Sequence, residues 1–207
     1  MSSASNDSSQ HSQFRLPRGF IGRIAGWIMA LQNRAMNRIT VEQLKIAPDD
    51  NVLEIGFGPG EAIKYLARKS QARTIIGVDP SPAMLKQGMS ANKQSVDAGR
   101  VMLIQGTVGA LPFAADRFAK AFAVSTFHDW ESRSAGLTEV KRVLENDGNL
   151  VLCLRQARKH PLPWSSPGLT VSELDEDLGL LKTAGFKEVR MIRRHFRQSI
   201  VCIVGSK

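Results

Sequence analysis

The sequence predicts an α/β fold, in which a mostly parallel sheet of seven strands ends in an antiparallel hairpin and is preceded by a helical arm. Three observations lead to this prediction. Short β-rich runs bounded by turn residues alternate with segments long enough for helices, as parallel strands joined by helical crossovers require. The first run ends in a glycine-rich turn. The last two runs lie too close together for a helical crossover, so we expect them to pair as a hairpin.

Length and composition fit one domain. The chain has 207 residues, 43% of them hydrophobic, which is enough for one substantial core and leaves little room for a second. Residues 1–13 are rich in Ser, Asn and Gln and lack an apolar core, so we expect a disordered tail and no signal peptide. Residues 14–47 form the expected helical arm and residues 48–207 the expected domain. No apolar run is long enough to cross a bilayer, and we expect a cytoplasmic protein.

The arm has an amphipathic basic pattern. Its apolar residues recur at helical spacing with arginines between them, and they are Ile21, Ile24, Ile28 and Leu31. Such a stripe usually packs on a core. Trp27, with its neighbouring arginines, is also compatible with contact to a membrane surface or to a substrate.

The expected first strand, residues 51–56, is followed by a turn that contains Gly56, Gly58 and Gly60. Glycine tolerates positive φ and lets another molecule approach the backbone closely, so we expect a ligand against bare main chain. A dinucleotide-binding G-x-G-x-x-G fingerprint would need glycine where the chain has Glu61. The pattern instead reads Glu-x-Gly-x-Gly-x-Gly, starting at Glu54.

The expected second strand, residues 73–78, leads directly into Asp79. In an open parallel sheet the carboxyl ends of neighbouring strands share one edge, where a carboxylate can accept hydrogen bonds from ribose hydroxyls. The first two strands therefore indicate a nucleoside pocket.

The remaining strands follow the same order. They are expected at residues 100–105, 118–124 and 148–154, with a helix over 131–145 and hairpin strands at 186–193 and 199–204. The segment from Ser125 to Trp130 follows the fourth strand at its carboxyl end, where ligands sit in open α/β sheets. It is therefore the predicted catalytic edge.

Together, these motifs resemble the class I S-adenosylmethionine-dependent methyltransferases, specifically the small type 11-like enzymes. The resemblance runs from Asp50 to the end and rests on L-E-I-G-F-G-P-G, G-V-D-P-S-P-A-M-L, L-P-F, K-R-V-L with Gly148, and A-G-F, in the family's order. It implies a Rossmann-like methyltransferase sandwich with S-adenosylmethionine as cofactor, and an arm that folds over that cofactor as a lid. The cofactor-binding residues that it implies are Glu54, Gly56, Gly58, Gly60, Asp79, Pro80, Met84, Gly106, Thr107, Val108 and Ser125.

The chain departs from the family pattern at two positions. Thr107 stands where the family has an aspartate that holds the adenine amino group, and its hydroxyl can accept the same hydrogen bond without a charge. Ala119 stands where the family has the aspartate of Phe-Asp. We interpret the role of that aspartate as local capping rather than chemistry, so its replacement mostly leaves the site unchanged.

His128 is the candidate catalytic residue, because an imidazole can take a proton from an acceptor hydroxyl or amine near neutral pH. The alternative is that His128 and Trp130 cover the cofactor and pack on the following helix, since methyl transfer can be accelerated by positioning alone. The candidate substrate-contacting residues are Phe127, His128, Trp130 and, from the arm, Trp27. No metal is expected.

The formal charge of +9 leaves a nucleic-acid partner open, but we do not favour it, because a solvated basic face is the simpler explanation. The segment after the fourth strand lacks the Pro-Pro-aromatic pattern of adenine methyltransferases, and the chain shows no Pro-Cys for cytosine C5 chemistry. Cys153 and Cys202 lie in apolar runs and are interpreted as buried hydrophobic residues.

The resemblance leads to one functional expectation, methyl transfer from S-adenosylmethionine to a small-molecule or lipid-like acceptor. Two alternatives stay open: an RNA methyltransferase that uses the basic surface, and a cofactor-binding protein without turnover. Peripheral membrane contact is compatible with the arm, and the protein is expected to be a monomer or a homodimer.

Overall fold

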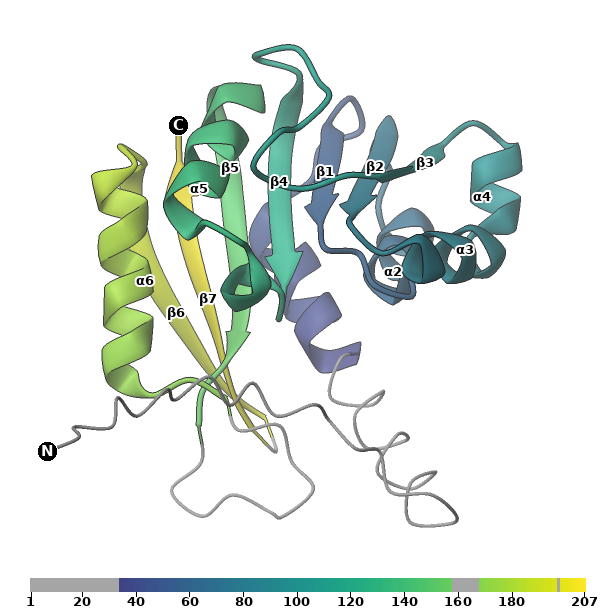
Figure 1. The fold of residues 1–207 in the computed structure, drawn as a ribbon. Helices are drawn as coiled ribbons and strands as arrows, with labels where there is room; N and C mark the ends of the chain where they lie inside the picture. The colour runs from purple at the N-terminus through teal and green to yellow at the C-terminus, as the bar shows by residue number, and fades with distance from the viewer. Residues whose placement is uncertain (1–33, 158–167, 197) are drawn as a thin grey trace, which may run out of the picture.

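The computed structural model describes residues 34–157, 168–196 and 198–207. Its centre is a seven-stranded sheet in the order β3-β2-β1-β4-β5-β7-β6 (Figure 1). The strands are β1 Asn51–Ile55, β2 Thr74–Asp79, β3 Val101–Gln105, β4 Phe118–Val124, β5 Leu144–Arg155, β6 Lys187–Phe196 and β7 Gln198–Ser206. Strands β1 to β5 pair in parallel, whereas β7 is antiparallel to both β5 and β6. The predicted mostly parallel sheet with a terminal antiparallel hairpin is confirmed.

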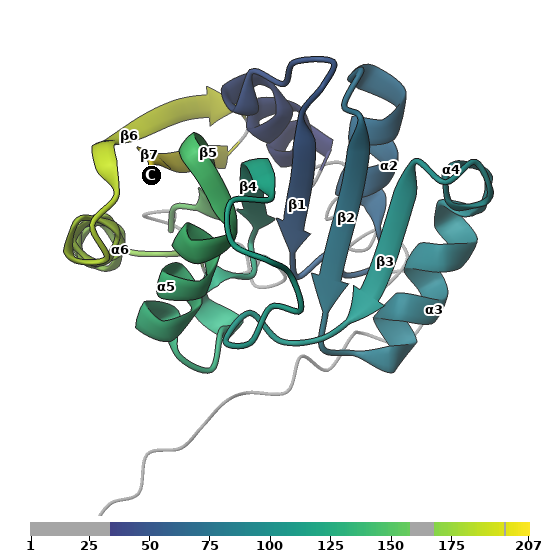
Figure 2. The same ribbon diagram turned by 90° about the horizontal axis from the view of Figure 1, so that it is seen from above.

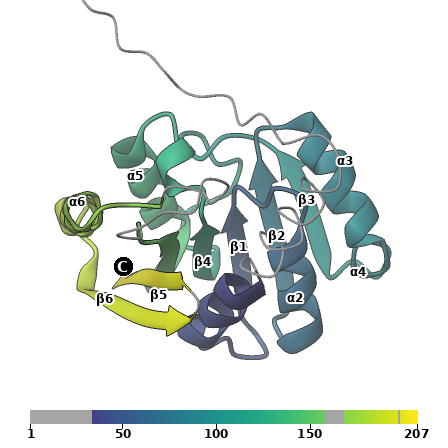
Figure 3. The same cartoon turned by 90° about the horizontal axis from the view of Figure 1, so that it is seen from below.

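Helices cover both faces of the sheet. They are α2 Glu61–Lys69, α3 Pro82–Ala91, α4 Lys93–Asp97, the 3-10 turn η1 Phe127–Asp129, α5 Arg133–Val143 and α6 Val171–Thr183, together with helical residues 34–44. The buried side chains of α5 and α6 pack on one face, and those of α2 and residues 34–44 pack on the other. Figures 2 and 3 show these two helical layers on opposite sides of the strands.

The central strands of the sheet are buried on both faces, as a covered parallel sheet requires. In β1, Val52 belongs to the core under α2, whereas Leu53 and Ile55 belong to the core under α5 and α6. This two-sided burial explains why apolar residues stand at consecutive positions in β1, where Glu54 is the only buried polar residue.

Side-chain caps mark the starts of α5 and α6. Ser132 accepts a hydrogen bond from the Ala135 amide at 3.3 Å, so α5 begins after it, two residues later than expected. Thr170 and Glu173 form a capping box at the start of α6. These caps fix where the helices leave the carboxyl edge of the sheet.

Strand β5 begins at Leu144 instead of residue 148, because Phe118 pairs with Leu144 before the register shifts to the pair Lys120 and Asn149. Asp147 lies in this irregular stretch with φ 64°. The sequence predicted that residues 144 and 145 end the preceding helix. The bulge instead lets β5 begin at Leu144 and continue past the turn at Asp147. The hairpin strands are likewise longer than the two apolar runs that predicted them.

Helical residues 34–44 belong to the core. Met36, Thr40 and Leu44 are at most 1% exposed, and Ile39 is 5% exposed. Residues 34–44 and the domain after the expected boundary at residue 48 therefore share one core, because their side chains pack together. The predicted tail, the stripe from Ile21 to Leu31 and Trp27 lie outside the described residues, and the lid role stays a prediction.

Candidate active site

The glycine-rich turn lies at the carboxyl end of β1, at the edge to which the arrows of β1, β2 and β4 point in Figure 1. Gly56, Gly58 and Gly60 all have positive φ, at 73°, 52° and 83°. A Cβ on Gly56 would lie 2.7 Å from the Thr126 side chain, and one on Gly60 would lie 2.6 Å from Asn92 Nδ2. A Cβ on Gly58 would meet nothing within 4 Å. Gly58 therefore presents bare backbone to open space, which is what a ligand-binding turn requires.

Asp79 joins this turn to the end of β2. Its Oδ2 accepts a hydrogen bond from the Gly58 amide at 2.8 Å, and its Oδ1 accepts one from the Ser81 amide at 2.9 Å. The residue is only 6% exposed. A carboxylate oxygen has two lone pairs, so each oxygen can still accept a hydrogen bond from a ribose hydroxyl.

Glu54 is the second buried carboxyl at this edge. It is 2% exposed, and its Oε2 has no hydrogen-bond partner among the described residues. Burial raises the pKa of Glu54 well above its usual value, the neighbouring Asp79 charge raises it further, and the Ile63 amide acts in the opposite direction. A buried and unpartnered carboxyl oxygen beside a ligand-binding turn is costly unless a ligand group or water satisfies it.

The loop after β3 supplies the third side of the expected nucleoside pocket. The Gly106 amide donates to the Asp79 carbonyl at 3.1 Å, and the next residue, Thr107, is exposed. Val108 is buried. Pro80 is exposed and Met84 half-buried at the start of α3. The implied cofactor residues of β1, β2 and β3 thus lie on adjacent strand ends.

The same loop is fastened to α5 by charged side chains. Glu139 accepts a hydrogen bond from the Leu111 amide at 3.1 Å, and Arg142 donates to the Leu111 and Phe113 carbonyls at 3.1 and 2.8 Å. Arg142 also pairs with Glu139, which lowers the pKa of that carboxyl. The L-P-F motif is therefore a fixed turn, held by the helix that leads to β5.

The end of β4 is strained at Ser125, whose φ is 57° although it is not a glycine. Such a conformation costs about 1 to 3 kcal/mol and persists only where the surroundings hold it. The Ser125 amide donates to the Cys153 carbonyl at 2.9 Å, and its hydroxyl lies 3.6 Å from Met36 Sδ. The next residue, Thr126, donates to the Ile55 carbonyl at 2.9 Å. The edge after β4 is thus bound to the end of β1 and to helical residues 34–44.

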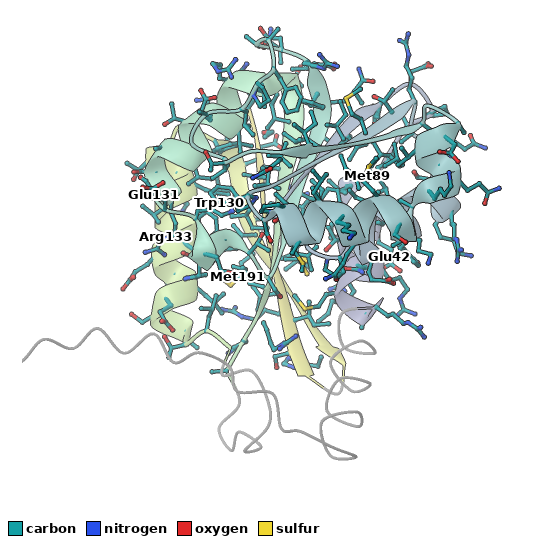
Figure 4. The ribbon with its side chains drawn as sticks, turned by 45° about the vertical axis from the view of Figure 1, so that its right-hand side comes forward. Glu42, Met89, Trp130, Glu131, Arg133 and Met191 are labelled. Atoms are coloured by element: carbon teal, nitrogen blue, oxygen red, sulfur yellow. The ribbon has the colours of Figure 1, made fainter. Side chains whose placement is uncertain are left out.

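Two of the candidate substrate residues lie beneath this edge. Phe127 is 0% exposed, and its ring packs edge-on against Trp130 with centroids 4.9 Å apart. Trp130, labelled in Figure 4, is 9% exposed, and its Nε1 has no hydrogen-bond partner among the described residues. A Cβ on Gly136 would lie 2.5 Å from the indole and 3.0 Å from Val108. The indole therefore packs towards the loop after β3, which is the expected cofactor side.

His128 is exposed, with 31% of its side chain accessible. Its Nε2 lies 2.7 Å from Asp177 Oδ2, and Arg133 Nη1 donates to Asp177 Oδ1 at 2.7 Å. Asp177 is 0% exposed. Burial raises its pKa, and the hydrogen bonds and charges of His128 and Arg133 act in the opposite direction. Figure 4 shows Arg133 beside α6, close to Trp130.

Sequence reasoning missed Asp177, although the sequence holds a signal for it. Leu174, Asp177 and Leu181 are the buried residues of α6, at positions i, i+3 and i+7. A carboxyl within an apolar helical stripe must find partners, because an unpaired buried charge is strongly unfavourable. That pattern predicts a buried ion pair, but the partner 49 residues away is visible only in the fold. The described residues hold no group of three or more potential metal ligands, and none of their helices is long and apolar enough to span a membrane.

Comparisons with known proteins agree with this geometry. A family model described as a methyltransferase domain matches residues 53–152. The chain is 29% identical over 185 residues to the uncharacterized methyltransferase YdaC of Bacillus subtilis, covering 89% of this chain and 98% of that protein. It is 31% identical over 121 residues to the ubiquinone/menaquinone biosynthesis C-methyltransferase UbiE of Geotalea daltonii, covering 58% of this chain and 52% of that protein.

A solved structure shows the same fold. The S-adenosylmethionine-dependent methyltransferase from Aquifex aeolicus superposes with a TM-score of 0.66, covering 88% of this chain and 97% of that one at 16% identity. The likeness therefore shows that the chain has the Rossmann-like methyltransferase fold. The chain thus carries a methyltransferase domain over residues 53–152 and is similar over most of its length to relatives named as methyltransferases.

Proposed function

We propose that this protein binds S-adenosylmethionine at the edge formed by β1, β2 and β3, and transfers its methyl group to a small-molecule or lipid-like acceptor at the end of β4. One observation supports this most strongly. The bare backbone of Gly58 borders open space while its amide is held by the Asp79 carboxylate. A turn built in this way leaves room for a ligand to approach its backbone closely.

The residues present fit the cofactor. Asp79 would accept hydrogen bonds from the ribose hydroxyls, and Thr107 with Val108 would border the adenine. The buried, unpartnered Oε2 of Glu54 is a ready acceptor for a cationic or hydroxyl group of the ligand. When bound, the cofactor supplies an electrophilic methyl group on a sulfonium, and the chain contributes binding, orientation and exclusion of water.

A lipid-like aromatic acceptor is the first candidate for the methylated substrate. The similarity to UbiE supports it, since that enzyme is a C-methyltransferase of ubiquinone and menaquinone biosynthesis. The chain spans about half the length of that relative, so the acceptor belongs to the proposal. We also propose a cytoplasmic setting, which the free thiols of Cys153 and Cys202 support.

Among the described residues, the placement of the basic side chains on β6 argues against RNA as the acceptor. Arg190, Arg193 and Arg194 are exposed on β6, at the outer edge of the sheet. Two strands, β5 and β7, separate β6 from β4. This basic strand therefore does not converge on the Ser125 to Trp130 edge, and charged residues on an edge strand are a common protection against edge-to-edge association.

Transfer of a labelled methyl group tests the proposal. Purified protein and S-adenosylmethionine labelled in the methyl group are incubated separately with lipid extract, total RNA and a polar metabolite extract. We expect label in the lipid or metabolite fraction, and no label above background with the Gly58→Ala protein. Label in RNA alone would replace the proposed acceptor with the RNA alternative. Cofactor binding without label in any fraction would favour a protein without turnover.

A further inference from the structure

The contact between His128 and Asp177 joins two segments that are distant in sequence. The η1 turn holds His128 directly after β4, and α6 holds Asp177 on its buried face. The 2.7 Å separation between Nε2 and Oδ2 requires a shared hydrogen. The second oxygen of Asp177 is taken by Arg133 at 2.7 Å. The carboxyl group is therefore fixed in direction as well as in position.

This arrangement decides which imidazole nitrogen carries the proton. An ionised carboxylate only accepts hydrogen bonds, so the hydrogen between the two residues belongs to Nε2. Burial disfavours that ionised form, whereas the Arg133 guanidinium, which donates to Oδ1 at 2.7 Å, favours it. In a neutral imidazole with a proton on Nε2, Nδ1 is unprotonated. Among the described residues Nδ1 has no hydrogen-bond partner, so it remains available to another molecule.

We propose that Asp177 is a positioning residue that holds His128 in the Nε2–H tautomer and so presents Nδ1 as the proton acceptor of the methyl-transfer site. This inference rests on the proposed function. Nδ1 takes the proton that the acceptor loses when its oxygen, nitrogen or carbon atom bonds to the methyl carbon. The electron pair of the broken carbon–sulfur bond stays on sulfur, and the proton passes from the imidazolium to solvent.

The charged groups around His128 come from three elements. Asp177 and Glu173 lie on α6, Arg133 lies on α5, and Asp129 shares the η1 turn. His128 and Arg133 both lower the pKa of Glu173 through their charge, although its hydrogen bonds with Thr170 are the larger cause. The imidazole ring also meets Phe127 edge-on at 5.8 Å. These contacts limit the rotation of the ring, which a defined proton acceptor requires.

A purely structural role is the alternative, because the same cluster also ties α6 to α5. The chain offers a matched control for that role. Lys141, also on α5, donates to the Ala184 and Gly185 carbonyls at 3.3 and 2.7 Å and so fastens the other end of α6. Lys141→Met loosens the same helix pair without touching His128. A structural role predicts similar effects for Asp177→Asn and Lys141→Met, whereas a positioning role separates them.

Long-range ¹H–¹⁵N spectra of protein with ¹⁵N-labelled histidine report the tautomer directly. The chain has four histidines, and His128→Gln identifies the signals of interest. We expect the Nε2–H form in wild type, with and without S-adenosylhomocysteine. Asp177→Asn should shift His128 towards Nδ1–H, because the new amide can donate to Nε2. Lys141→Met should keep the wild-type tautomer. A wild-type Nδ1–H form, or an unchanged tautomer in Asp177→Asn, would overturn the proposal.

Turnover is the second readout. It is measured with the extract fraction that the wild-type protein methylates in the labelling experiment. Asp177→Asn should lower kcat by about 100-fold, the lower end of the range for lost proton transfer. Its dissociation constant for S-adenosylmethionine should stay within about twofold of wild type. Lys141→Met should keep kcat even where its melting temperature falls. Equal losses of kcat in both variants would indicate a structural role. Failure of wild type to bind the cofactor would instead reject the proposed function and leave the tautomer result standing.

Discussion

The backbone amide of Gly58 and the Asp79 carboxylate are joined by a hydrogen bond of 2.8 Å across the ends of β1 and β2. The bond makes the glycine-rich turn and the expected ribose-binding carboxylate one unit, because Asp79 also accepts from the Ser81 amide at the start of α3. A change on either strand end is therefore expected to affect the other. This coupling is the basis of the predicted cofactor pocket.

The first prediction concerns Gly58→Ala, with Gly99→Ala as the control. Both glycines have positive φ, at 52° and 70°, and an added Cβ meets nothing within 4 Å at either position. Each alanine therefore costs a similar strain of about 1 to 2 kcal/mol. Only the Gly58 variant places a methyl group in the proposed ligand space. Calorimetry should show at least about a tenfold loss of S-adenosylhomocysteine affinity for Gly58→Ala, or about 1.4 kcal/mol, and none for Gly99→Ala. Equal affinities would mean that the ligand does not approach this turn.

The second prediction concerns Thr107, at the position of the family's adenine-binding aspartate. The side chain is exposed, so Thr107→Asp introduces no buried charge. A hydrogen bond to a charged acceptor is roughly twice as strong as a neutral one. Titration of Thr107→Asp should give S-adenosylhomocysteine affinity equal to or tighter than that of wild type. If a folded variant no longer binds, the adenine must lie elsewhere.

The third prediction is the pH dependence of Glu54→Gln. Folding raises the pKa of Glu54 above its ordinary value of 4.5, so the folded protein holds this proton more tightly than the unfolded chain. The contribution of protonated Glu54 to the free energy of unfolding is fully present below about pH 4.5 and is lost as the pH rises through the raised pKa. Glu54→Gln keeps the shape and removes the ionisation. In urea unfolding at about pH 5 and pH 8, the stability of Glu54→Gln relative to wild type should be greater at the higher pH. The same substitution at exposed Glu61 should show a much smaller change, and a pH-independent difference for Glu54 would contradict the burial argument.

Local patterns predicted the fold well because each strand could be recognised from its own residues. The glycine turn and Asp79 were equally local signals. Glycines that allow positive φ and a carboxylate at the end of a strand can both be read directly from the sequence. The buried position of Phe127 could not be predicted from the neighbouring sequence. It was expected to contact substrate, yet its ring packs in the interior against Trp130. Only the path of the chain after β4 decides which of the two neighbours, Phe127 or His128, faces outward.

Contacts between distant segments account for the rest of what the sequence did not predict. Met36 meets Ser125 across 89 positions, and His128 meets Asp177 across 49. Neither pair has a spacing that a periodic pattern could reveal. The arm was interpreted through its apolar stripe at residues 21–31, whereas the helix that the structure describes, residues 34–44, contributes to the core.

The fourth prediction tests that packing through Leu44→Ala. Leu44 is 0% exposed, so the substitution leaves a cavity and should cost about 2 to 5 kcal/mol of unfolding free energy. Glu42→Ala on the same helix is the control. Glu42 is exposed and pairs with Arg38 at 3.6 Å on the surface, where such pairs contribute about 0 to 1 kcal/mol. Denaturant unfolding measures both. A loss below about 1 kcal/mol for Leu44→Ala would show that this helix is not part of the folded core.

The most direct test of the central claim is calorimetric titration of S-adenosylhomocysteine and S-adenosylmethionine into the purified protein, with NADH as the comparison. We predict one site for both sulfur nucleosides and no binding of NADH. Asp79→Ala should weaken binding by roughly 1.5 to 3 kcal/mol, the contribution of hydrogen bonds to a charged group. Absence of binding by either sulfur nucleoside to the folded wild-type protein would contradict the account.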